Sequence, residues 1–113
     1  MTSRSRQPDR RRGLFITFEG SERSGKTTLI QLLASSLQES GYPVLVTREP
    51  GGDTQIGAFL RQTLLFSTRL QRETEALLFA ADRAEHVATI IQPALETGTI
   101  VFCDRYIDSS VAY

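Results

Sequence analysis

Eight consecutive residues, Gly20 to Thr27, have the types and spacing of a phosphate-binding loop. They read GSERSGKT and fit the pattern G-x-x-x-x-G-K-T. In such a loop successive backbone N–H groups surround a phosphate, and glycines permit the backbone angles and close approaches that this needs. Lys26 offers a cation to the β- and γ-phosphates, and Thr27 offers a hydroxyl to Mg²⁺. The predicted loop residues are Gly20, Ser21, Glu22, Arg23, Ser24, Gly25, Lys26 and Thr27.

The segments on either side of this loop have the periodicity that the motif requires. Residues 14–18, LFITF, form an apolar and β-branched run that predicts a buried strand. Leucines then recur at helical spacing, at Leu29, Leu32, Leu33 and Leu37. A chance match in a turn rich in Gly and Ser is the alternative, and it does not explain both flanks. We therefore expect strand, phosphate loop and helix in that order.

The rest of the chain alternates short apolar runs with helical patterns. Because strand–helix–strand units pair in parallel with right-handed crossovers, the order predicts a parallel α/β sheet with its ligands at the carboxyl ends of the strands. We expect helices over 26–40, 54–65 and 73–96, and strands over 44–47 and 99–103. Pro93 should kink the last helix or start a new turn in it. Residues 107–113 read as the start of another helix.

Composition restricts the class of protein. The 113 residues suffice for one small domain, and 40% of them are apolar, as in soluble globular proteins. No apolar run approaches the roughly 20 residues of a membrane span, and the N-terminus lacks the apolar core of a secretory signal. Cys103 is the only cysteine, so an internal disulfide is excluded. A cytoplasmic location is expected.

Charge is unevenly distributed, although the formal net charge is zero. Residues 1–12 contain five arginines against one aspartate. Such a basic tail could touch nucleic acid, but its shortness and lack of aromatic residues favour a disordered, solvated terminus. We expect a disordered tail over 1–12 and a folded domain over 13–113.

Two charged residues follow the third predicted strand. An acidic residue at the end of such a strand commonly anchors Mg²⁺ beside a phosphate loop, which makes Asp104 a candidate metal ligand. The alternative for Asp104 is a helix N-cap. The planar guanidinium of Arg105 suits a bidentate contact with phosphate, and an exposed surface arginine is its alternative.

The long predicted helix contributes a second candidate pair. Phe79 and Arg83 are four residues apart and share a helix face, where they could stack on a base and hydrogen-bond its edge. Core packing is the commoner fate of such a phenylalanine. His86 and Cys103 have no partner pattern for a metal or a nucleophile. We expect a solvated helix residue at His86 and a small buried apolar residue at Cys103.

Four segments together resemble thymidylate kinase in order and spacing, from about Leu14 to the last residue. They are FEG (18–20), TREPGG (47–52), LLFAADR (77–83) and DRYIDSSVAY (104–113). The phosphate loop alone is generic, whereas REPGG and DRYIDSS together are specific. The resemblance implies a P-loop nucleoside-monophosphate-kinase-like parallel sheet with flanking helices. Only the first three strands would be present, with the phosphate-loop strand at or near an open edge and the C-terminal half of the domain absent.

The same resemblance implies an activity. The enzyme would transfer the γ-phosphoryl group of ATP to dTMP with Mg²⁺, and dTDP would be formed. Its partner would be the small-molecule substrate, with neither nucleic acid nor a membrane, and the full-length enzyme would be a homodimer. Residues 1–113 alone would be inactive, since the lid and most adenine contacts belong to the other half.

Residue roles follow from the resemblance. Glu22 would lie near the sugar 3′-hydroxyl, Phe79 would stack on thymine, and Arg83 would donate to a base carbonyl. Ser110 and Tyr113 would line base and sugar, with the Tyr113 ring favouring deoxyribose. The cations around the monophosphate would be Arg48, Arg61 and Arg105. The catalytic set would be Lys26, Arg23, Asp104 and Arg105. Thr27 and Asp104 would be the metal ligands. Arg23 is similar to the loop arginine of eukaryotic members, which acts on the transferred phosphoryl group.

Three alternatives stay open: another P-loop nucleoside or nucleotide kinase, a nucleotide-binding module without phosphoryl transfer, and an inactive fragment. A simple switch needs no second anion site. The arginines at 48, 61, 83 and 105 therefore favour a kinase.

Overall fold

The described strands form one parallel sheet. The computed structural model describes residues 12–20, 25–66 and 70–105, with the backbone alone at 64–66. Strands β2 (Phe15–Glu19), β3 (Val44–Glu49) and β4 (Ile100–Arg105) lie in the order β2-β4-β3. The strand latest in sequence therefore occupies the centre, and it pairs in parallel with both neighbours. The expected parallel α/β architecture is confirmed.

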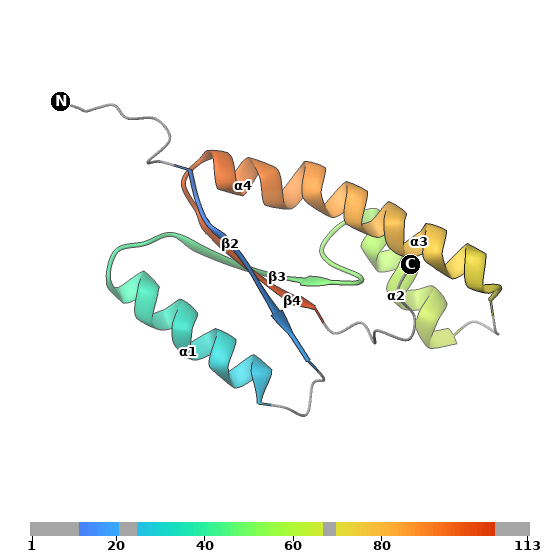
Figure 1. The fold of residues 1–113 in the computed structure, drawn as a ribbon, viewed down its shortest axis with the longest axis horizontal. Coiled ribbons are helices and arrows are strands. Elements are labelled where there is room, and N and C mark those ends of the chain that lie inside the picture. Colours follow the sequence, from blue (N-terminus) through green and yellow to red (C-terminus); the bar gives the residue numbers. More distant parts are fainter. Residues whose placement is uncertain (1–11, 21–24, 67–69, 106–113) are drawn as a thin grey trace.

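Helices cover both faces of this sheet (Figure 1). Helix α1 (Lys26–Glu39) lies on one face, and α3 (Arg72–His86), η3 (Val87–Ile91) and α4 (Gln92–Glu96) continue one another along the opposite face. Helix α2 (Gln55–Phe66) packs beside α3. The helices expected at 26–40 and 54–65 are confirmed to within a residue or two.

The expected long helix is divided by a π-helical turn, η3, immediately before the segment that contains Pro93. Proline has no N–H to donate to the carbonyl four residues earlier, and its ring clashes there with a regular α-helical turn. A widened turn relieves that clash, and Pro93 then lies in the first turn of α4. The irregularity expected at Pro93 is thus present as a π-turn.

Side chains of the central strand alternate between the two faces of the sheet. On the α1 side Ile100 and Phe102 pack against Ile30 and Ala34, and the Phe18 ring meets Phe102 edge-to-face at 5.0 Å between centroids. On the α3 side Val101 and Cys103 are fully buried, as expected for Cys103. The alternation places the next two residues, Asp104 and Arg105, on opposite faces.

The buried face of α3 differs from the expected apolar stripe. The apolar positions of this helix that fit the 3.6 period are Leu77, Ala80, Ala84, Val87, Ala88 and Ile91, and this spacing predicts that they form its apolar face. Leu77 is instead 71% exposed, and the residues that α3 buries are Phe79, Asp82 and His86. The expectation of a solvated His86 is wrong, because this side chain is 0% exposed. Polar groups at the end of β3 bond to the histidine ring and make its burial possible.

Large apolar side chains remain at the surface of the described part. Leu14, Phe15 and Ile16 are exposed, so the strand expected at 14–18 is present but the expectation that it is buried is wrong. The reason is that β2 lies at an edge of the described sheet, where the resemblance places the phosphate-loop strand. Leu29, Leu32 and Leu33 are exposed on α1. In the described part of the chain, no helix has the length and apolarity that a bilayer span requires.

We predict that Phe102→Ala destabilises the fold far more than Leu32→Ala. Phe102 is 2% exposed at the centre of the core, whereas Leu32 is 65% exposed. Truncating a buried phenylalanine costs about 3–5 kcal/mol, and an exposed substitution usually stays within about 0.5 kcal/mol. Urea unfolding followed by circular dichroism measures both, and equal midpoints would show that the core lies elsewhere.

Candidate active site

Lys26 connects the phosphate loop to the end of the central strand. Gly25 has a positive φ of 79° and caps α1, which begins at Lys26. The Lys26 Nζ lies 2.7 Å from Oδ1 of Asp104 and donates to the carbonyls of Gly20 at 2.5 Å and Arg105 at 3.2 Å. The side chain is buried, so these oxygens compensate its charge. The structure therefore brings together two of the four catalytic candidates, Lys26 and Asp104.

The donor chemistry beside Lys26 fits Mg²⁺. Thr27 lies exposed in the first turn of α1, and the side chain of Asp104 is 21% exposed. A hydroxyl and a carboxylate are hard oxygen ligands of the kind that Mg²⁺ prefers. These two residues are the ones that would hold the ion.

Some predicted site residues lie outside the described part of the chain. They are Ser21, Glu22, Arg23 and Ser24 of the loop, and Ser110 and Tyr113 near the last residue. The predicted basic tail lies outside it also, apart from Arg12. The roles given to these residues stay predictions.

A second charged cluster surrounds Glu49 on the α3 side of the sheet. Glu49 ends β3 and is 6% exposed. Its Oε1 accepts a hydrogen bond from Arg83 Nε at 3.1 Å, and Arg83 Nη2 lies at the same distance. Nε of Arg105 lies 3.6 Å from that oxygen, and Oε2 accepts from Nδ1 of His86 at 2.7 Å. One carboxylate thus faces three basic side chains.

The electrostatics of Glu49 favour its charged form. Burial by itself raises the pKa of this carboxyl, but the hydrogen bond from His86 and the positive charge of Arg83 outweigh burial and hold the pKa below its ordinary value. The other ring nitrogen of His86, Nε2, shares a hydrogen bond with the Thr47 hydroxyl at 2.6 Å. The ring therefore bridges Thr47 and Glu49.

The loop after β3 is held by α2 and α3. The Gly51 N–H donates to Oδ2 of Asp82 at 3.0 Å, and Arg61 donates to the carbonyls of Gly51 and Gly52. A side chain on Gly52 would come within 2.9 Å of the Arg48 carbonyl oxygen, so the packing there requires glycine. Arg61, expected among the cations around a monophosphate, thus binds loop carbonyls in this structure.

Asp82 carries a raised pKa. Burial is the main cause, and the negative charge of Glu49 adds to it, while the hydrogen bond from Gly51 acts in the opposite direction. Asp82 therefore serves chiefly as the acceptor that fixes the loop.

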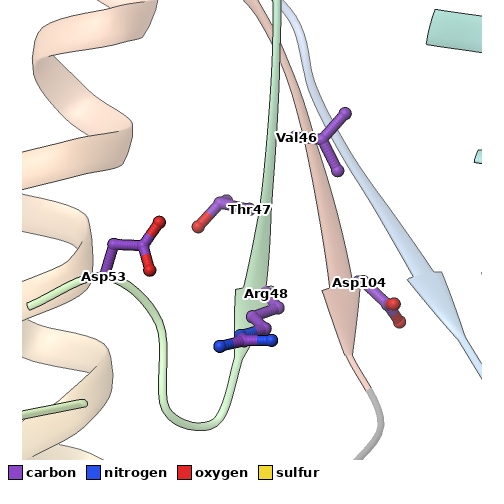
Figure 2. A pocket seen from close by; sticks show the side chains of 5 residues that line it. All are labelled: Val46, Thr47, Arg48, Asp53 and Asp104. Atoms are coloured by element: carbon purple, nitrogen blue, oxygen red, sulfur yellow. The ribbon is translucent and has the colours of Figure 1, made fainter. Parts of the chain in front are cut away.

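Arg48 points away from the Glu49 cluster. It is exposed and lines an open pocket of about 340 Å³ together with Val46, Thr47, Asp53 and Asp104. Figure 2 shows Arg48 and Asp104 at the ends of neighbouring strands, with Thr47 and Asp53 toward α3. Arg48 is thus placed near the Lys26–Asp104 pair, on the phosphate-loop side.

Phe79 and Arg83 differ in accessibility. The Phe79 ring is 5% exposed, so it presents little surface to a base in this arrangement, and its stacking role stays a prediction. The Arg83 side chain is 37% exposed and lines a cavity of about 100 Å³. The other lining residues are Phe15, Glu49, Val87, Ile91 and Arg105.

Sequence reasoning missed four residues of these networks: Thr47, Glu49, Asp82 and His86. Thr47, Glu49 and Asp82 lie inside the segments that carried the family resemblance, but nothing singled them out. A detectable signal existed on α3, where Asp82 and His86 are four residues apart and share a helix face.

Glu49, His86 and Cys103 also place one ligand atom each within 4.8 Å of one another. Hydrogen bonds already engage both ring nitrogens of His86. Burial, with the negative charge of Glu49 adding to it, raises the pKa of Cys103 to about 12, which leaves a thiol rather than the thiolate that binds metal. The cluster therefore reads as a hydrogen-bonded network.

We predict that Glu49 makes folding stability depend on acid pH. Since its folded-state pKa lies below 4.5, its stabilisation is complete above that pH and is lost as pH falls through the folded pKa. Asp82, with a raised pKa, contributes with the opposite sign. The informative quantity is therefore the difference in free energy of unfolding between the unsubstituted chain and Glu49→Gln, which should shrink as pH falls.

Urea titrations at pH values from about 6 to 3 measure this difference. The exposed Glu85→Gln, from the same helix as Arg83, is the control for the loss of one surface carboxylate. A constant difference for Glu49→Gln would contradict the assigned network.

Comparison with known proteins places these residues in a family. The model of the thymidylate kinase family matches residues 18–113. Thymidylate kinase of Thermomicrobium roseum is 63% identical over 99 residues, covering 88% of this chain and 47% of that protein. A probable thymidylate kinase of Pyrococcus abyssi is 51% identical over 107 residues, covering 90% of this chain and 52% of the relative.

A solved structure supports the same family assignment. The crystal structure of thymidylate kinase from Ehrlichia chaffeensis superimposes with a TM-score of 0.76 at 46% identity, covering 88% of this chain and 54% of that one. The chain thus spans about half the length of the curated relatives it matches. With the family model matching most of its length, the chain belongs to the thymidylate kinase family.

Proposed function

We propose that the chain supplies the phosphate loop and much of the acceptor site of an enzyme that transfers the γ-phosphoryl group of ATP to dTMP, giving dTDP and ADP. The observation that carries the proposal is the arrangement of charges at the end of β4. Lys26 and Asp104 lie on its α1 side, while Arg83 and Arg105 meet on its α3 side. Two separate anion sites at one sheet end suit a reaction between two phosphates.

The residues on the α1 side would serve the donor nucleotide. Phosphoryl transfer depends mainly on positioning and charge neutralisation. Lys26, now paired with Asp104, would exchange that partner for the β- and γ-phosphates. Thr27 and Asp104 would hold Mg²⁺, which when bound neutralises phosphate charge. The partial positive charge at the N-terminus of α1 adds to the attraction.

The residues on the α3 side would serve the acceptor. Arg105 would contact the monophosphate and Arg83 the base carbonyl, with Arg48 beside the Lys26–Asp104 pair, where the two phosphates would meet. Arg61 would act indirectly, through the loop carbonyls that it binds. Stacking by Phe79 would require its ring to become more accessible.

The remaining roles rest on the family pattern. Arg23 would stabilise the transferred phosphoryl group, and Glu22 would lie near the 3′-hydroxyl. Ser110 and Tyr113 would line base and sugar. We also propose a cytoplasmic enzyme that works as a homodimer, without nucleic acid as a partner.

We predict a preference for dTMP over dCMP. Arg83 is a pure hydrogen-bond donor, which suits the thymine 4-carbonyl and opposes the cytosine amino group. The test uses residues 1–113 joined to the C-terminal half of the Thermomicrobium roseum relative, hereafter the completed enzyme, with ADP release measured on a panel of nucleoside monophosphates. Equal turnover of dTMP and dCMP would reject dTMP as the specific acceptor.

We predict that Lys26→Ala in the completed enzyme lowers kcat by about a hundredfold or more, in line with the loss of a preorganised cation. Asp104 also loses its partner, so a melting curve should accompany the assay. Arg72→Ala, at the exposed start of α3, is the control and should keep full activity. Activity of Lys26→Ala within about tenfold of the original, a barrier change of about 1.4 kcal/mol, would show that the loop does not serve catalysis.

A further inference from the structure

Glu49 belongs to the TREPGG segment, but the resemblance assigns it no function, and it lies beside the two arginines proposed to bind the acceptor. We infer that Glu49 is a positioning residue that aligns Arg83 and Arg105 with each other, so that one acceptor nucleotide is held at its base and at its phosphate together. The inference rests on the proposed function, and it adds a residue that acts through both arginines.

The contacts of Glu49 support alignment of both cations by one oxygen. Arg83 places Nε and Nη2 at 3.1 Å from Oε1, which fixes the plane of its guanidinium. Nε of Arg105 is buried without a hydrogen bond in the described part of the chain and lies 3.6 Å from the same oxygen. A shift of a few tenths of an ångström would turn this ion pair into a hydrogen bond. Glu49 can therefore set the separation of the two guanidinium groups.

A hydrogen-bonded chain through His86 holds the Glu49 carboxylate on the side away from the arginines. Oε2 accepts from His86 Nδ1 at 2.7 Å, and His86 Nε2 is hydrogen-bonded to Thr47 at 2.6 Å. Glu49 and His86 are both buried. A buried chain from Thr47 on β3 through His86 on α3 back to Glu49 leaves the carboxylate little freedom to follow a moving arginine.

The backbone of Arg105 links this cluster to the donor side. Its carbonyl accepts from Lys26 Nζ at 3.2 Å, while its side chain faces Glu49 across the sheet end. Arg105 also reaches Glu19, whose side chain is 68% exposed, at 3.4 Å. Two carboxylates pair with Arg105 among the described residues, and that of Glu49 is the one shielded from water, so Glu49 should align Arg105 more strongly than Glu19 does.

The main test compares Glu49→Gln with Glu19→Gln in the completed enzyme. Both remove one carboxylate charge beside Arg105, but only the first is buried and shared with Arg83. We expect Glu49→Gln to raise KM for dTMP about tenfold to a hundredfold, since small misplacements of binding groups cost that much. KM for ATP should change by less than about threefold, and selectivity over dCMP should fall. Glu19→Gln should change KM for dTMP by less than about twofold.

If Glu49 contributed only to the stability of the fold, Glu49→Gln would have different effects on stability, KM and selectivity. The variant would then lose thermal stability, and any folded fraction would keep its KM for dTMP and its selectivity. That result, or equal effects of Glu49→Gln and Glu19→Gln, would overturn the inference.

Two variants of His86 give a second, independent test. The amide N–H of Asn can replace the Nδ1–H that donates to Glu49, whereas the amide of Gln reaches the Nε2 position beside Thr47. If the histidine acts by holding Glu49, His86→Asn should keep KM for dTMP closer to the original value than His86→Gln does. The opposite order would contradict the proposed chain.

The failure of the proposed function would be separable from the failure of this inference. Absence of dTMP-dependent ADP release by the unsubstituted completed enzyme would reject the function alone. NMR of the arginine Nε–H groups needs no turnover and reads the alignment directly. Slow exchange of the Arg83 and Arg105 Nε protons that becomes fast in Glu49→Gln supports the inference, and fast exchange in the unsubstituted protein overturns it.

Discussion

The burial of one carboxylate at the end of β3 constrains the site more than any other feature. A charged Glu49 that is 6% exposed must be compensated by hydrogen bonds and by opposite charge, because burial otherwise favours its neutral form. Arg83 and His86 from α3 and Arg105 from β4 supply that compensation. Helix α3 and two strands are thereby held at a common point, and the loop after β3 is fixed in turn by Asp82 of the same helix.

The alternation of side chains along β4 explains how one strand end could serve the two nucleotides of the proposed reaction. Asp104 turns toward α1 and Lys26, and Arg105 turns toward α3 and Glu49. The residues proposed to bind the donor and those proposed to bind the acceptor therefore lie on opposite faces of the same sheet. The hydrogen bond from Lys26 to the Arg105 carbonyl connects the two groups. This arrangement at the end of β4 suits in-line transfer, in which donor and acceptor phosphates must be brought together despite their charge.

Much of this architecture follows from local sequence patterns, but the buried polar network does not. Continuous apolar runs located the strands, and period-3.6 apolar patterns located the helices α1 and α2. Burial of apolar side chains dominates the folding of such elements. His86 was misjudged because a polar residue is buried only where tertiary partners satisfy it, and its partners Thr47 and Glu49 are 39 and 37 residues away in the chain. Arg61 was expected at a ligand, yet it bonds to loop carbonyls. The chemistry of single residues does not predict such long-range pairings.

The most direct test of this account is a crystal structure of the completed enzyme with dTMP and a non-hydrolysable ATP analogue. We expect the triphosphate on the α1 side in contact with Lys26, which has left Asp104, and dTMP on the α3 side. We also expect Arg83 and Arg105 both to contact Glu49 while they bind dTMP. Both nucleotides on one side of the sheet, or arginines that bind dTMP with Glu49 detached from them, would contradict this account.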